Sequence, residues 1–216
     1  MHVGFRQPLI FPIGHYMGEI SVPGSGQGRS HFIRRDSDLV QLTRQQFHVW
    51  MLARGRKGEL DRRRWTRGVA EREASRLGVT DPAAIVDGLV TTGLIAEMVP
   101  GRKAAYRFAL AYQLHPLMLG LGNSRYEPWL FGIGFGEQPV LRVRRDLFGL
   151  WEWANGDDNL WQACQAYADV EVAAGGADRD HTDPQRVLTR LVRSLHLFTA
   201  NSAAYLDVAR RAESAS

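Results

Sequence analysis

Short apolar runs near the start of the chain predict strands. Residues 9–13 (LIFPI) and 31–35 (HFIRR) are short and rich in β-branched and aromatic residues, a pattern typical of strands. The stretch between them, 21–30 (SVPGSGQGRS), is rich in Gly and Ser, so it predicts a loop. The chain therefore begins with sheet structure rather than with a helix.

Three stretches with apolar residues at helical spacing follow the strands. The first, 42–55, is apolar at Leu42, Phe47, Trp50 and Met51 and ends at a glycine, which suits the residue after a helix. The second runs over 65–78, and the third begins near Thr80. We expect three consecutive helices from this pattern.

The tripeptide TDP opens two segments that lie about a hundred residues apart. The segments 80–90 (TDPAAIVDGLV) and 182–192 (TDPQRVLTRLV) share their first three residues and their final Leu-Val pair. A Thr or Asp side chain can cap a helix, and proline is tolerated in the first turn because its missing N–H costs nothing there. TDP therefore predicts the start of a helix in both places.

A β-hairpin is predicted after the third helix of each half. In the first half, the strand 94–98, a turn and the alternating segment 105–112 form this hairpin. In the second half, residues 195–208 form it around Asn201 and Ser202. Each half then consists of strands, three helices and a hairpin.

Four matches in the same order indicate an internal repeat. Residues 8–14 match 128–134, residues 31–36 match 141–146, and the Trp50 helix matches the helix of Trp151 and Trp153; the TDP segments are the fourth match. The sequence predicts an α+β protein with two tandem domains. Their bounds are 1–111 and 127–216, with a connection over 112–126.

Charge distinguishes the two halves. Residues 1–110 hold 17 Lys+Arg against 10 Asp+Glu, whereas residues 111–216 hold 10 against 13. The basic first domain can approach a polyanion, and the acidic second domain is less suited to it. Solvated arginine-rich surfaces would explain the same imbalance.

Helix, helix, helix and hairpin is the element order of a winged helix-turn-helix, and residues 71–95 resemble that family. The resemblance covers 43–110 well and 146–208 loosely. It implies two winged-helix-like domains and a DNA-binding transcriptional regulator. Small or apolar residues fall where bacterial regulators of the family keep them: Ala74, Gly78, Val79, Ile85, Leu89, Gly93, Leu94 and Ile95.

The strands that precede the helices resemble a different relative, the RiPP recognition element. That family binds leader peptides of ribosomally made natural products, which add as a strand at a sheet edge. The resemblance implies a module that presents a precursor peptide to separate modifying enzymes. Double-stranded DNA is the first partner expected from the sequence, and a leader peptide is the alternative.

Candidate contact residues for a ligand lie in both domains. The first domain's third helix begins with Asp81, Ala83, Ala84 and Asp87, which are poor base readers. DNA phosphates would instead meet a basic cluster and the turn of the hairpin, at Arg62, Arg63, Arg64, Arg67, Arg102 and Lys103. The second domain's third helix offers possible base or partner contacts at Gln185, Arg186, Thr189, Arg190 and Arg193.

No catalytic arrangement is recognisable, so we expect a binding protein that is not an enzyme and needs no cofactor. The histidines have no metal-ligand spacing and do not cluster with the single cysteine, Cys164, so no metal site is expected. We expect Trp50, Trp151, Trp153 and Trp161 to pack in cores or between domains. No signal peptide or membrane span is recognisable, so we expect a cytoplasmic protein, with a homodimer as one possible assembly.

Overall fold

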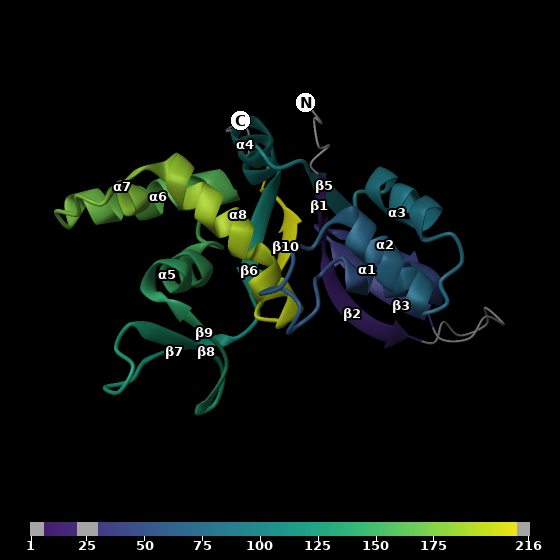
Figure 1. Ribbon diagram of the computed structural model, residues 1–216, viewed down its shortest axis with the longest axis horizontal. Helices are drawn as coiled ribbons and strands as arrows, with labels where there is room; N and C mark the ends of the chain where they lie inside the picture. The colour runs from purple at the N-terminus through teal and green to yellow at the C-terminus, as the bar shows by residue number, and fades with distance from the viewer. Residues whose placement is uncertain (1–6, 21–29, 211–216) are drawn as a thin grey trace. The chain divides into compact units, whose positions relative to one another are not determined.

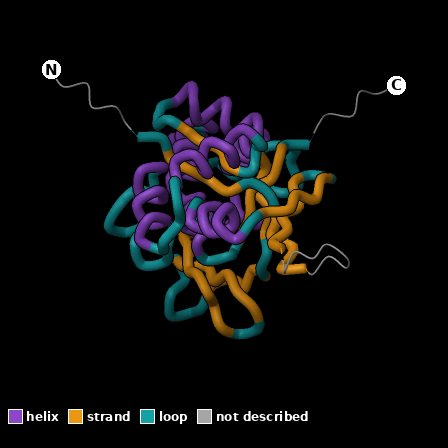
Figure 2. The backbone as a smooth tube through the Cα atoms, turned by 90° about the vertical axis from the view of Figure 1, so that its right-hand side faces the viewer, coloured by secondary structure: helices purple, strands orange, loops and turns teal. Residues whose placement is uncertain are grey.

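The computed structural model describes residues 7–20 and 30–210 of the chain. It contains two compact units, Met1–Pro100 and Gly101–Ser216, called the first and the second unit below. Helices and small antiparallel sheets occur in both units (Figures 1 and 2), so the chain has the α+β class that the sequence predicts.

The strands of the first unit form two small sheets. β2, β3 and β4 form a three-stranded antiparallel meander, and β1 pairs with β5 in an antiparallel two-stranded sheet. Among the described residues, four strands therefore precede the helices and one follows them. The sequence had predicted two strands before the helices and a hairpin after them. The strands are β1 (Leu9–Pro12), β2 (His15–Ile20), β3 (Ser30–Arg35), β4 (Asp38–Leu42) and β5 (Ile95–Met98).

Three helices lie between β4 and β5: α1 (Arg44–Leu52), α2 (Arg67–Arg76) and α3 (Pro82–Thr91). Thr43 and Gln46 form a reciprocal capping box at the start of α1, which satisfies two backbone N–H groups. The core joins strand and helix residues, among them Ile10, Ile33 and Trp50. This core holds the unit together through apolar burial.

The second unit begins with a helix and continues with strands and helices in the order of the first unit. β7, β8 and β9 form a meander, and β6 pairs with β10 in an antiparallel sheet. The strands are β6 (Tyr112–Pro116), β7 (Leu119–Asn123), β8 (Leu130–Phe135), β9 (Gln138–Arg144) and β10 (Ala204–Val208). The helices are α4 (Arg102–Ala111), α5 (Arg145–Trp153), α6 (Leu160–Ala173), α7 (Arg179–Thr182) and α8 (Pro184–Ala200).

Both units therefore share one chain order: a strand, a three-stranded meander, helices, and a final strand that pairs with the first. Both TDP segments start a helix, as the sequence predicts. The Asp81 side chain accepts from the backbone N–H of Ala84 at 3.2 Å, and Asp183 accepts from that of Gln185 at 2.9 Å. The proline of each segment is the first residue of the helix.

The passage from the last long helix to the final strand is also the same in both units. Gly93 and Ser202 have positive φ angles of 70° and 56°, and each donates its N–H three residues back along the helix. The backbone N–H of the next residue, Leu94 or Ala203, donates to the carbonyl five residues earlier in the helix. The carbonyl of the same residue accepts from the backbone N–H of the residue that follows the first strand, Ile13 or Leu117. Only glycine takes this conformation without cost, so Ser202 adopts a strained backbone.

The hairpin predicted after the third helix is absent from the first unit, because its second segment is helical. Residues 102–111 form α4 in the second unit. Ala105, Phe108 and Ala109 are buried at helical spacing, and the helix packs against α6 and α8. Alternation of apolar residues over 105–112 had predicted a strand, but an alanine-rich segment also favours a helix, and packing decides between them.

The second predicted hairpin is half helix as well. α8 continues to Ala200, and only residues 204–208 form a strand. The buried residues of α8 extend from Val187 through Leu195 to Phe198 at helical spacing. The predicted turn at Asn201 and Ser202 is the end of this helix.

The repeat also has a different register from two of the sequence matches. Residues 8–14 hold β1, which corresponds by its pairing to β6, whereas the matched residues 128–134 lie in β8. Residues 31–36 hold the middle strand of one meander, whereas 141–146 hold an edge strand and a helix start. The units divide at Pro100, and the expected connection 112–126 contains β6 and β7.

Candidate binding groove in the second unit

Two arginines of the predicted phosphate cluster are engaged within the first unit. Arg63 forms ion pairs with Glu59 at 3.2 Å and with Glu73 at 2.9 Å. Glu73 is buried, and it also pairs with Arg56 and Arg76. A hydrogen bond from Arg63 and the nearby arginine charges lower the pKa of Glu73, against the opposing effect of burial.

Arg67 is the most heavily paired residue of that cluster. Its guanidinium lies 2.6 Å from Glu71, 2.8 Å from Asp87 and 3.2 Å from Glu97. Burial lowers its pKa, but hydrogen bonds to Glu71 and Asp87 outweigh this and raise it overall. Three carboxylates neutralise Arg67, so a phosphate would have to compete with all of them.

The other predicted phosphate ligands are exposed. The side chains of Arg62 and Arg64 form no hydrogen bond or ion pair within the described part of the chain. Arg102 and Lys103 are exposed in the first turn of α4, in the second unit. Of the predicted phosphate ligands, the structure therefore leaves Arg62 and Arg64 unpaired in the first unit and places the two hairpin cations in the second unit.

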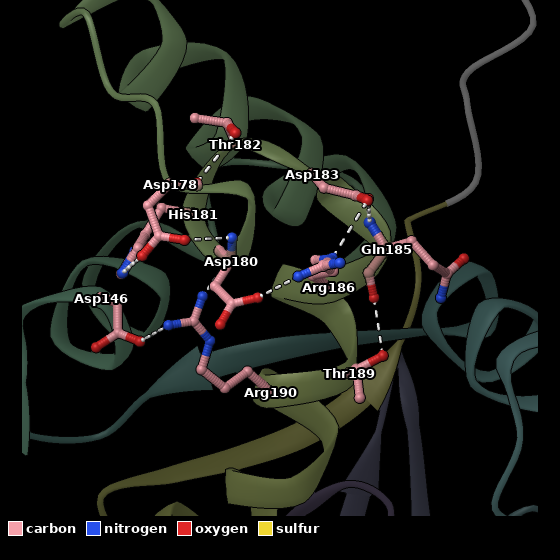
Figure 3. Close-up of polar contacts among 10 residues, drawn as sticks. All are labelled: Asp146, Asp178, Asp180, His181, Thr182, Asp183, Gln185, Arg186, Thr189 and Arg190. Atoms are coloured by element: carbon pink, nitrogen blue, oxygen red, sulfur yellow. Dashed lines mark hydrogen bonds and ion pairs between the residues drawn. The ribbon is translucent and has the colours of Figure 1, made fainter.

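Most of the predicted base or partner contacts on α8 are engaged within the second unit (Figure 3). Arg190 lies 2.6 Å from the Asp146 carboxylate and also donates to the main-chain oxygen of Asp180. Arg186 lies 2.8 Å from the Asp180 carboxylate, and Thr189 donates to the main-chain oxygen of Gln185. A hydrogen bond from Arg186 lowers the pKa of Asp180.

Two residues of this set differ from the others. Arg193 is exposed, and within the described residues its side chain forms no hydrogen bond or ion pair. The Nε2 atom of Gln185 is buried without a hydrogen-bond partner. One free cation and three tethered polar groups do not form a surface for reading bases.

A groove of about 510 Å³ lies between α5 and α6, entirely within the second unit. One wall uses residues of α5 at helical spacing, and the other uses α6 in the same way. Phe131 of β8 closes one side. The residues of the two helices and their connection that line it are Arg145, Phe148, Gly149, Leu150, Glu152, Trp153, Ala154, Asp157, Ala163, Ala166, Tyr167, Val170 and Glu171.

Small residues line the groove together with large apolar residues, two of which are strongly exposed. Gly149, Ala163 and Ala166 line it without filling it. Trp153 on α5 is 73% exposed, and Val170 on α6 is 66% exposed. Exposed apolar groups of this size gathered in one depression mark a binding surface more often than a solvated one.

The polar groups of the groove fall into two sets. At the start of α5, Arg145 lies 3.8 Å from Glu171 of α6. Tyr167 lies nearby, and burial followed by the charge of Glu171 raises its pKa to about 12, so its hydroxyl stays protonated at neutral pH. The carboxylates of Glu152 and Asp157 have no bonded partner within the described residues.

A buried tryptophan contacts the end of the corresponding helix in the first unit. Trp50 lies two residues before the last residue of α1, and Trp151 lies two residues before the last residue of α5. Leu52, the last residue of α1, therefore corresponds to Trp153, the last residue of α5. The buried indole of Trp65 donates to the Leu52 carbonyl at 2.6 Å. The longer connection between α1 and α2 supplies Trp65, and the shorter one between α5 and α6 supplies no such side chain.

The sequence missed the exposure of Trp153. Trp50 and Trp151 are buried, as expected, and Trp161 packs edge-on against Tyr106. Trp153 was expected to pack in a core or between domains, yet its side chain is strongly exposed. Residues two apart on a helix point about 200° apart, so Trp151 and Trp153 cannot both face one core. This spacing was the available signal for an exposed aromatic residue.

The described residues provide little for covalent or metal chemistry. Cys164 is buried, and burial raises its thiol pKa to about 12, so it is not a thiolate at neutral pH. No group of three or more His, Cys, Asp and Glu side chains within the described residues could hold a metal ion. No described helix is both long and apolar enough to cross a bilayer. Comparison of the chain with protein-family models, curated proteins and solved structures gives no match.

Proposed function

We propose that the protein is a non-catalytic peptide-binding module, and that the groove between α5 and α6 receives an apolar side chain of the peptide. The observation that carries this proposal is the groove itself, with Trp153 and Val170 exposed at its edge. An aromatic residue beside an apolar depression is the usual anchor site of a peptide or protein ligand.

The size and openness of the groove support a peptide side chain as its occupant. A volume of about 510 Å³ lies within the range of ligand-binding pockets, roughly 300–1,000 Å³. Two residues of its lining, Trp153 and Val170, are strongly exposed, so the groove is open to solvent and a longer ligand need not be enclosed in it. A bound peptide would cover Trp153 and Val170, and apolar burial would then favour binding.

The order of elements is a second support. Each unit places a three-stranded meander before its helices, and two predicted strands ahead of the helices were the basis of the resemblance to the RiPP recognition element. Under this proposal, the natural ligand is a segment of a precursor peptide that separate enzymes modify.

DNA, the partner first expected from the sequence, is the alternative ligand, and exposed cations support it. Arg62, Arg64 and Arg193 are available to phosphates. Against it stand the ion pairs of Arg63 and Arg67 and the small and acidic outer surface of α3. Phosphate contacts of this kind would also weaken steeply with salt.

The test fills the groove. Short random peptides displayed on phage are selected against the full chain, and the best are synthesised with a fluorescent label. Ala166→Trp places an indole in the groove, and Gln165→Trp places one on an exposed part of α6 outside it. We expect affinity to fall by at least about tenfold in the first variant and to stay unchanged in the second.

Two outcomes would overturn the proposal. One is a selection that yields no peptide with saturable binding. The other is equal binding by the Ala166→Trp variant, provided that circular dichroism confirms its fold. A mobility shift with random duplex DNA at low and moderate salt tests the alternative, which fails if no shift occurs at low salt.

A further inference from the structure

We infer that the groove selects peptides in which a Lys or Arg lies next to the apolar anchor, with Glu152 and Asp157 as the carboxylates that bind the cation. This inference rests on the proposed peptide-binding function and specifies its ligand class. The groove has an apolar interior and two partly buried acidic groups at the end where Trp153 lies.

Glu152 carries a carboxylate that the fold leaves unused. It lies in the last turn of α5, beside Trp153, and its side chain is only partly exposed. A Cβ atom added at Gly120 of β7 would lie 2.8 Å from Glu152 Oε1, so the strand passes close to this oxygen. No cation of the described residues pairs with Glu152. A partly desolvated carboxylate gains from a cation that a ligand supplies.

Asp157 is the second unpaired carboxylate. It lies in the connection after α5, where its main-chain oxygen accepts from Gln113 Nε2 at 2.6 Å and fixes the backbone. Burial and the neighbouring charge of Asp158 raise its pKa, so the charged form is disfavoured without a cation. A bound Lys or Arg would favour the charged form and release this cost.

Among the described residues that line the groove, the one cation lies at its other end. Arg145 is the first residue of α5 and Glu152 the eighth, which separates their backbones by about 10 Å at the helical rise of about 1.5 Å per residue. Arg145 is also close to Glu171, and the two charges offset each other. At the end with Trp153, the carboxylates of Glu152, Asp157 and Asp158 outnumber the guanidinium of Arg210, which donates to the Asn155 carbonyl at 3.1 Å, so an acidic or fatty-acid ligand would be disfavoured there.

The experiment compares the peptides that different variants select from the same phage library. From the unmodified chain we expect sequences in which Lys or Arg neighbours an aromatic or aliphatic residue. For one such synthetic peptide, the double variant Glu152→Gln with Asp157→Asn should bind at least about tenfold more weakly. Asp169→Asn, an exposed carboxylate of α6 outside the groove, is the matched control and should not change affinity.

Replacing the basic residue of the peptide gives the coupling between the two sides. If Glu152 and Asp157 bind this residue, its replacement by norleucine should weaken binding to the unmodified chain and have little effect on the double variant. Glu152→Lys should shift the selected sequences toward acidic residues. Increasing salt should reduce affinity for the unmodified chain more than for the double variant.

The inference and the proposed function fail in different ways. Peptides that compete for the groove, as judged by loss of binding in Ala166→Trp, but that show no basic enrichment would overturn the inference and leave the function standing. Equal affinity of the double variant and the unmodified chain would do the same. Failure of any peptide to bind the groove would overturn both.

Discussion

Arg190 of α8 and Asp146 of α5 form an ion pair of 2.6 Å that joins two helices of the second unit. Figure 3 shows the carboxylate and the guanidinium facing each other. The Asp146 side chain is 5% exposed, whereas that of Arg190 is 29% exposed. A carboxylate this deeply buried needs its cation, because an unpaired buried charge is costly. The pair therefore holds α5, one wall of the groove, against α8.

We predict that Asp146→Asn lowers the free energy of unfolding by about 2–3 kcal/mol, at the lower end for a buried pair because Arg190 is partly exposed. Urea denaturation followed by circular dichroism measures the change. Glu127→Gln, which disrupts an exposed pair with Arg142, is the control and should cost less than about 1 kcal/mol. Equal losses in the two variants would contradict the prediction.

The neighbours Arg63 and Arg64 should differ in their effect on stability. Arg63 pairs with Glu59 and the buried Glu73 and lies over the ring of Trp65, whereas Arg64 is exposed. We expect Arg63→Ala to destabilise the protein by about 1–2 kcal/mol, since Glu73 keeps its two other arginines. Arg64→Ala should leave the denaturation midpoint unchanged, and a larger effect at Arg64 would refute this assignment.

Glu73 should make stability sensitive to acid. Its pKa is lowered in the folded protein, whereas in the unfolded chain it titrates near the ordinary value of 4.5. Its pairing therefore stabilises the fold fully above that pH, and the contribution is lost as the pH falls through the lower, folded-state pKa. Glu73→Gln removes this proton-linked part.

The measurement is the difference in unfolding free energy between the unmodified chain and Glu73→Gln as a function of pH. We expect this difference to be constant near neutral pH and to shrink as the pH falls below the ordinary value of 4.5 and through the lower, folded-state pKa. A difference that stays constant over the whole range would show that Glu73 does not titrate with a lowered pKa.

Gly93 and Gly88 offer a matched pair of glycine substitutions near the end of α3. Gly93 has a φ of 70°, and a Cβ atom there would collide with the guanidinium of Arg35. A Cβ at the helical Gly88 would meet no atom within 4 Å. We expect Gly93→Ala to destabilise by about 1–2 kcal/mol and Gly88→Ala to stabilise by about 0.5–1 kcal/mol. Thermal unfolding of both variants checks the opposite signs.

A feature of the site could be predicted from the sequence where it depends on residues close together along the chain. The helix starts at Asp81 and Asp183 were predicted correctly because a cap depends on residues within one turn. The groove was not predicted, because it results from side chains that are missing between two helices. The alternate positions of Trp151 and Trp153 contained part of the signal, since one of them had to face away from the core.

The sequence by itself determined the α+β class, the helix starts at Asp81 and Asp183, and the apolar stripes of the helices that begin there. These features depend on spacing within a few residues, and local propensity and burial act on that scale. Tertiary structure alone decided that residues 102–111 form a helix, that Arg63, Arg67 and Arg190 are paired with carboxylates, and that Glu152 and Asp157 are not. Such choices depend on which distant side chains meet, and that is set only when the chain has packed.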